Sequence, residues 1–84
     1  MKVLFEDVLF GGIDEGKNGK KTVLLLEDGK VRKVIASAVE GEATRGDDVN
    51  VVVEGVSSVF NDFGDLKIQA ALVRLNTDAS FEVL

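Results

Sequence analysis

The sequence contains no cysteine, histidine, proline, tryptophan or tyrosine among its 84 residues. Without cysteine the chain has no disulfide, no thiol nucleophile and no zinc–thiolate site. Without histidine it lacks the commonest catalytic base and transition-metal ligand. The remaining chemistry offers little for catalysis, so we expect a protein that is not an enzyme and that uses no metal or cofactor.

Long apolar runs are also missing. No stretch of about 18 apolar residues, the length that spans a bilayer, occurs in the chain. The opening residues MKVLFEDVLFGG are interrupted by Glu6 and Asp7, and no small-residue cleavage site follows them. We therefore expect a cytoplasmic protein that does not interact with membranes.

What the chain does have is β-branched and other apolar residues: 14 Val, 9 Leu, 3 Ile and 5 Phe. Val is stiff at χ1 and packs well on a pleated surface, so its excess over Leu favours strands. With no proline, turns have to come from glycine, asparagine and aspartate. The length suits one domain, which we expect to cover residues 1–84.

Alternating apolar residues bounded by turn signals predict a series of short strands. Asp28-Gly29 is the strongest hairpin signal, and Gly55 indicates a bulge or a barrel corner. The stretch 11–20 is predicted as a loop, and 38–48 as a connection with room for one helical turn. The expected strands are 2–10, 21–27, 30–37, 49–60, 66–75 and a short final one at 80–83.

The predicted fold class is all-β, and five main strands joined by short turns fit a sandwich or a barrel. Closure into a barrel is favoured because it removes the edges that Val-rich strands would otherwise expose. Phe60, near the end of a predicted strand, is expected in the core. Phe63 lies in a predicted hairpin loop between Asp62 and Gly64, where a large apolar residue has little core to enter.

The net charge of −5 is unevenly distributed along the sequence. Residues 17–33 carry six basic side chains against two acidic ones, whereas the rest of the chain has four basic and thirteen acidic. Because charges more than about 8–10 Å apart are screened at physiological salt, a basic face on an acidic body is compatible with this composition. The adjacent acidic pairs, by contrast, are predicted to be solvated turn and surface carboxylates, since neighbouring residues on a strand point to opposite faces.

Several segments of the chain carry a resemblance to a known family. The run RGDDVNVVVEG at 45–55, followed by a variable hairpin and GDLKIQA at 64–70, resembles the last two strands of OB-fold single-stranded-DNA-binding proteins. GKNGK at 16–20, Ser57-Ser58 and FGDLKI at 63–68 resemble the compact single-stranded-DNA-binding protein of filamentous phages. That family stacks bases largely on tyrosines, which this chain lacks.

The resemblance implies an all-β fold, a five-stranded antiparallel Greek-key barrel of the OB-like type. It also implies a protein that binds single-stranded DNA, or RNA, with little sequence preference, as a homodimer, in the replication of a phage or mobile element. Phe63 would stack a base, and it should share one groove with the lysines of 17–21. Single-strand binders combine such aromatic platforms with a cationic groove. The implied nucleic-acid-binding residues are Lys17, Lys20, Lys21, Lys30, Arg32, Lys33 and Phe63.

The alternative to nucleic-acid binding is a non-enzymatic β-barrel that serves as an interaction or assembly module, such as a phage structural or adaptor protein. An acidic surface without tyrosine suits that role at least as well. A salt-sensitive affinity for single strands would separate the two hypotheses, because an assembly module lacks it.

Overall fold

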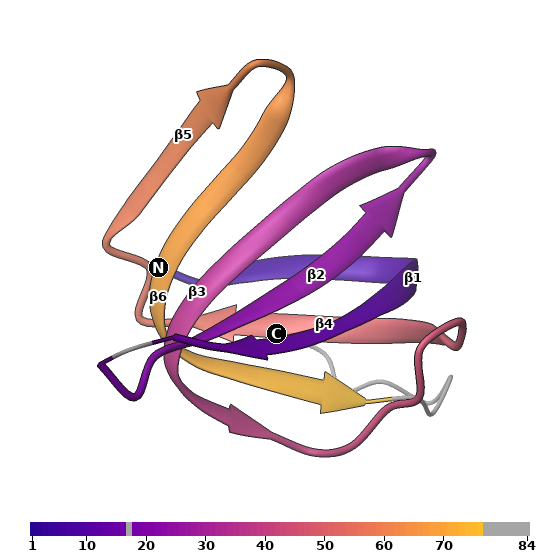
Figure 1. Cartoon of the computed structure of the whole chain (residues 1–84), viewed down its shortest axis with the longest axis horizontal. Helices are drawn as coiled ribbons and strands as arrows, with labels where there is room; N and C mark the ends of the chain where they lie inside the picture. Colours follow the sequence, from indigo (N-terminus) through magenta and orange to yellow (C-terminus); the bar gives the residue numbers. More distant parts are fainter. Residues whose placement is uncertain (17, 77–84) are drawn as a thin grey trace.

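The structure, a computed structural model, describes residues 1–16 and 18–76, which form strands and turns without any helix. Figure 1 shows the arrangement of the strands. They are β1 (Val3–Glu15), β2 (Lys21–Glu27), β3 (Lys30–Glu40), β4 (Asp48–Glu54), β5 (Ser58–Asp62) and β6 (Asp65–Asn76).

Five of these strands close into a barrel. The sheet order is β3-β2-β1-β4-β6-β5, and an additional pairing between β3 and β6 closes the ring. The predicted all-β fold with a five-stranded barrel is confirmed, and the strand order is compatible with an OB-like barrel. The sixth strand, β5, pairs with β6 outside the ring.

The prediction of a purely antiparallel barrel is wrong, because β3 and β6 run parallel from Arg32–Leu66 to Glu40–Arg74. The reason is geometric. A closed ring with an odd number of strands cannot alternate direction at every step, so at least one neighbouring pair must be parallel. Here β1 pairs antiparallel with β2 and β4, and the mismatch falls at the β3–β6 seam.

The first strand is longer than predicted, since residues 11–15 continue β1 rather than forming a loop. Its register shifts twice, between Phe5 and Val8 against β4 and between Phe10 and Gly12 against β2. Asp7, with a φ of 54°, forms the first irregularity, and its N–H donates to Oδ1 of Asn50 at 2.9 Å. These bulges bend β1 so that its two halves pair with different neighbours.

The predicted strand 49–60 is divided into β4 and β5. Gly55 turns the chain between them with a φ of 67°, as expected for a barrel corner. A Cβ at this position would lie 2.7 Å from Cβ of Ala71, so the approach of β6 leaves room for glycine alone. The corner directs β5 away from the ring. The final strand expected at 80–83 lies outside the described residues.

The connection after β3 holds no helical turn. β3 continues to Glu40, and a turn then leads into β4. In this turn the backbone N–H of Thr44 donates to Oδ2 of Asp47 at 3.0 Å, and the N–H of Asp47 donates to the carbonyl of Thr44 at 2.9 Å. The aspartate side chain thus stabilises a turn in place of a helix start.

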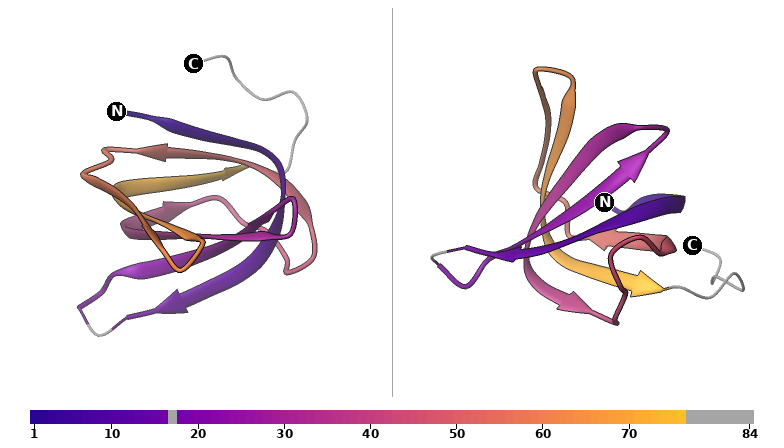
Figure 2. Two further views of the ribbon diagram at one scale, coloured as in Figure 1. Left: turned by 90° about the horizontal axis from the view of Figure 1, so that it is seen from above. Right: turned by 45° about the vertical axis from the view of Figure 1, so that its right-hand side comes forward.

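The core fills the ring and is apolar throughout the described residues, with no buried polar or charged side chain. In β2 the alternate residues Val23 and Leu25 point inward, and in β3 Val34 and Ala36 do the same, as strand geometry requires. Two hairpins, β2–β3 and β5–β6, project beyond the barrel on the same side (Figures 1 and 2). The main buried side chains are Phe5, Val8, Phe10, Val23, Leu25, Val34, Val49, Val51, Val53, Ile68 and Val73.

Candidate nucleic-acid interface

The two projecting hairpins end in turns of the same kind. Asp28 and Gly29 have φ values of 51° and 77°, and Phe63 and Gly64 have values of 51° and 85°. Positive φ at both central residues is the feature of the type I′ turn, which matches the twist of the flanking strands. The hairpin predicted at Asp28-Gly29 is therefore confirmed, and the predicted loop around Phe63 is a tight two-residue turn.

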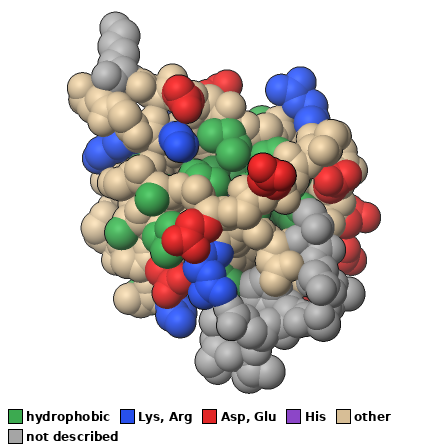
Figure 3. Space-filling view, turned by 90° about the horizontal axis from the view of Figure 1, so that it is seen from below, with side chains coloured by type: hydrophobic (Ala, Val, Ile, Leu, Met, Phe, Trp, Pro, Cys, Tyr) green, Lys and Arg blue, Asp and Glu red, His purple; other side chains and the backbone are tan. Residues whose placement is uncertain are grey.

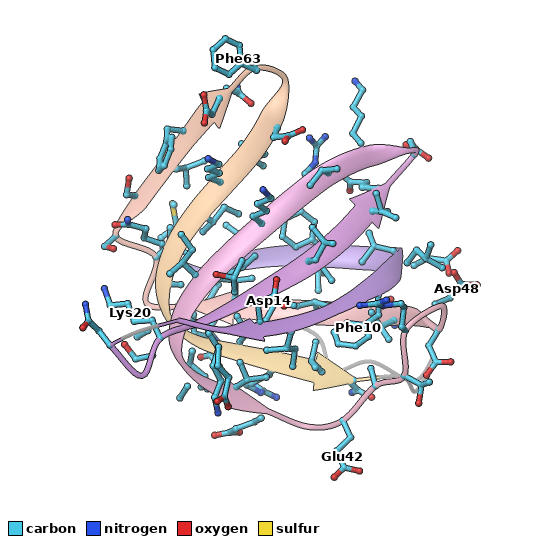
Figure 4. The ribbon with its side chains drawn as sticks, viewed as in Figure 1. Phe10, Asp14, Lys20, Glu42, Asp48 and Phe63 are labelled. Carbon is cyan, nitrogen blue, oxygen red and sulfur yellow. The ribbon has the colours of Figure 1, made fainter. Side chains whose placement is uncertain are left out.

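A groove of about 520 Å³ separates the two hairpin ends. Lys30, Val31 and Arg32 line one wall, and Asn61, Phe63 and Asp65 line the other. Figure 4 shows Phe63 at the extreme end of its hairpin. The structure thus brings together three of the residues that the sequence assigned to nucleic-acid binding.

Phe63 occupies its turn at a cost. Asn, Asp and Gly are the residues that adopt positive φ readily, and for a bulky residue such a conformation is an outlier. Its ring is also fully exposed, at 102% of the reference area, so it contributes nothing to the core. A strained backbone that presents an unburied aromatic ring points to a role outside folding.

The electrostatics of the hairpins are balanced rather than basic. Nε of Arg32 donates to Oε1 of Glu27 at 3.2 Å, and Nζ of Lys67 donates to Oδ2 of Asp62 at 2.8 Å. Each of these cations is therefore partly neutralised by its own hairpin. Lys30 is exposed and lines the groove on the wall opposite Asp65. Of the basic face that the sequence composition allowed, the groove keeps only Lys30 and the ion-paired Arg32 as cations.

The outer face of these strands also brings basic and aromatic side chains together. Lys33 and Lys67 are register partners in the β3–β6 pairing, and Phe60 is the partner of Lys67 across β5–β6. These side chains point away from the core, because their neighbours Val34 and Ile68 are buried. Lys33 thus lies on this outer face and not in the groove.

Two residues of this outer face were misjudged from the sequence. Phe60 was expected in the core but is 42% exposed, because β5 lies outside the closed ring. Lys67 was not among the predicted site residues. The sequence signal that could have revealed this pair is the two-residue turn at Phe63-Gly64. Such a turn fixes the register of the β5–β6 hairpin and places Phe60 opposite Lys67.

Two of the remaining predicted lysines, Lys20 and Lys21, lie away from the groove. Lys17 lies outside the described residues. Lys20 is exposed in the β1–β2 turn, and Lys21 begins β2, half-buried. Because β2 has seven residues, its two ends are about 20 Å apart. Figure 4 shows Lys20 far from Phe63, so the expected common groove of the 17–21 lysines with Phe63 is not formed by Lys20 and Lys21.

A different face of the molecule carries side chains of mixed character. On the face in Figure 3, basic and acidic side chains are interspersed with apolar ones. A second hollow of about 440 Å³ is lined by Ile13, Glu42, Asp47 and Leu75 among others, and Asp47 is already engaged by Thr44. No group of three or more acidic side chains in the described part of the chain is arranged to hold a metal ion.

Comparison with protein-family models, curated proteins and solved structures gives no match for this chain. Nor do residues 1–16 and 18–76 include a helix that is long and apolar enough to cross a membrane. The case for a function therefore rests on the residues of the two hairpins.

Proposed function

We propose that the protein binds single-stranded nucleic acid, DNA in the first place, without catalysis and with little sequence preference. The observation that carries the proposal is Phe63, a fully exposed ring held in a strained turn beside the groove that Lys30 and Arg32 line. Single-strand binders use such a pairing of an aromatic platform with cations. Every base has a π-face, so recognition of this kind tolerates any sequence.

In the proposed complex, one base stacks on Phe63 and contributes about 1–3 kcal/mol. The flanking phosphates contact Lys30 and Arg32. Arg32 exchanges its carboxylate partner Glu27 for a phosphate, whose oxygens suit the planar guanidinium equally well. Lys33 contacts the strand where it passes over the outer face, next to Lys67.

The small number of free cations limits the affinity and sets its salt dependence. If the strand neutralises three cations, log K should fall with log[salt] with a slope of about −2. Lys20 and Lys21 lie near the other end of β2 and would contact only a strand long enough to follow β2. The affinity for short oligonucleotides should therefore depend on the hairpin cations alone. The affinity for longer ones should depend on Lys20 and Lys21 as well.

The test is a fluorescence-anisotropy titration of labelled oligo-dT at about 50 and 200 mM salt. Two double variants remove equal charge from the two places, Lys30→Ala/Lys33→Ala from the hairpins and Lys20→Ala/Lys21→Ala from the other end of β2. For a short oligonucleotide we expect the first variant to weaken binding by about tenfold and the second to have a smaller effect.

Absence of binding by the parent protein at the lower salt would overturn the proposal. Equal losses in both variants would argue against the groove as the main contact. A double-stranded competitor of the same length serves as a control, since stacking on Phe63 requires an unpaired base.

A second candidate function is supported by a different observation. β5 lies at the edge of the sheet and exposes Val59 and Phe60. An exposed edge strand with apolar side chains suits a module that assembles with another protein chain. This role is compatible with the acidic net charge and requires no nucleic acid.

A further inference from the structure

The outer edge of β5 has no partner in the described part of the chain. Every barrel strand pairs on both sides over part of its length, whereas β5 pairs with β6 alone. Figure 1 shows β5 at the margin of the projecting hairpin. Natural edge strands are usually protected by lysine, proline, a bulge or a covering element. Residues 58–62, SVFND, contain no lysine or proline.

The hairpin register shows which backbone groups face this edge. Asp62 and Asp65 flank the two-residue turn, so they form a hydrogen-bonded pair, and the alternation makes Phe60–Lys67 the next one. Residues between hydrogen-bonded pairs direct their N–H and C=O groups the other way. The N–H and C=O groups of Val59 and Asn61 therefore point to the free edge.

We infer that β5 pairs antiparallel with β5 of a second copy of this chain, about a two-fold axis at Phe60. In this register Val59 faces Asn61 of the other copy and Asn61 faces its Val59, so both N–H and both C=O groups on each edge find a partner. Phe60 then faces its own symmetry mate in a non-hydrogen-bonded pair, where side chains lie closest. Aromatic pairs at such positions are favourable.

The charges of β5 suit a second copy of the same strand. Its one charged residue is Asp62, which is ion-paired with Lys67 of its own chain at 2.8 Å. In the symmetric register Asp62 faces Ser58 of the other copy, whose hydroxyl can donate to the carboxylate. No two like charges oppose each other across the axis. The pairing also covers Val59 and Phe60, which are 46% and 42% exposed in one chain.

This inference does not depend on nucleic-acid binding, because it uses the β5 edge and not Phe63, Lys30 or Arg32. The two can therefore fail separately. A dimer formed in this way would place two hairpin grooves in one particle and raise avidity for a long strand.

The first experiment measures molar mass by sedimentation at protein concentrations of about 1 to 200 µM. We expect the mass to rise from 9.0 kDa toward twice that value. Val59→Pro removes one N–H that faces the edge and should weaken association at least about tenfold. Val59→Thr is the matched control, because it keeps the N–H and the branched shape, and it should associate like the parent.

A second experiment tests the register and does not rely on a proline. The chain has no cysteine, so one introduced thiol can pair only with its symmetry mate. Phe60→Cys brings two thiols together at the axis, at a Cα separation of about 4.5 Å that a disulfide can bridge. Ser58→Cys is on the same face but lies about 13 Å from its mate. Mild oxidation should cross-link the first variant and leave the second as monomer.

A monomer at every concentration would overturn the inference, as would a dimer that Val59→Pro leaves intact. Equal cross-linking of the two cysteine variants would also reject the symmetric register. Circular dichroism of each variant confirms that the fold is retained. Oligo-dT titration of Val59→Pro then reports on nucleic-acid binding separately.

Discussion

Lys33 of β3 and Lys67 of β6 lie side by side in the parallel pairing of these strands. Both side chains point to the outer face, and like charges directly opposite each other destabilise a sheet. Lys67 is ion-paired with Asp62 at 2.8 Å, whereas Lys33 forms no ion pair within the described residues. A bound phosphate would relieve the repulsion between the two lysines.

Replacing Lys33 by glutamine should therefore affect stability and binding in opposite directions. The free energy of unfolding should rise by about 0.2–1 kcal/mol, because a like-charge pair is removed. Affinity for oligo-dT should fall, with the salt slope smaller by about 0.7. Urea denaturation and anisotropy titration measure the two effects. Lys2→Gln, which removes an ion pair with Glu54, is the control and should not stabilise; a loss of stability in Lys33→Gln would contradict the argument.

Replacing Phe63 by asparagine should also separate the two properties. Asparagine adopts positive φ more easily, so the turn should gain about 1 kcal/mol in the free energy of unfolding. Loss of the stacking platform should weaken oligonucleotide binding by about 1–3 kcal/mol. Asp28→Asn places asparagine at the equivalent turn position of the other hairpin without removing an aromatic ring, and it should not weaken binding. If Phe63→Asn binds like the parent, Phe63 is not the stacking residue.

Two glycines with similar backbone conformations should differ in their tolerance of alanine. Gly41 and Gly64 have φ values of 87° and 85°. A Cβ at Gly41 would collide with the carbonyl oxygen of Leu75, whereas nothing lies within 4 Å of a Cβ at Gly64. Gly64→Ala should cost about 1 kcal/mol from the backbone alone, and Gly41→Ala at least about 2 kcal/mol more. Thermal denaturation of the two variants measures this difference. Similar melting temperatures for Gly41→Ala and Gly64→Ala would contradict the prediction.

The stability of the protein should depend on Glu54 in acid. Arg74 donates a hydrogen bond to Glu54 at 3.2 Å and Lys2 lies 3.6 Å away, and these cations lower the pKa of the Glu54 carboxyl below its ordinary value of 4.5. A carboxyl with a lower pKa in the folded state contributes stability above its unfolded pKa. That contribution is lost as the pH falls through the folded pKa.

Glu54→Gln should consequently lower stability at neutral pH and flatten its decline below about pH 5. Urea denaturation at a series of pH values measures this slope. Glu42→Gln, a change at an exposed loop residue, provides the comparison. An unchanged slope in Glu54→Gln would show that the ion pairs with Arg74 and Lys2 contribute nothing.

Several elements were predictable because their signals are local. β2 begins and ends where alternation and the Asp28-Gly29 turn indicated, and Gly55 turns the chain as a corner. The extent of β1 was not predictable in the same way. Glycine and aspartate usually indicate loops, but in β1 they lie at bulges within the strand. The strand continues through them because it pairs with β2 and β4, and a local sequence pattern does not reveal these partners.

The residues of the candidate site were also predictable only in part. The sequence identified Lys30, Arg32 and Phe63, because a cationic segment and an aromatic residue in a turn are visible without a fold. It could not show that Arg32 is held by Glu27, or that Lys20 lies near the opposite end of β2 from the groove. Charge counted along a chain does not specify which charges share a face.

The sequence by itself determined the all-β character, the β2–β3 hairpin with its Asp28-Gly29 turn, and the absence of cysteine and histidine chemistry, since these depend on residue type and short-range pattern. Only the tertiary structure decided the parallel β3–β6 seam, because an odd ring of strands requires one parallel neighbour pair. It also decided that β5 remains outside that ring. For this reason Phe60, which has a core-like sequence pattern, is exposed to solvent beside Lys67.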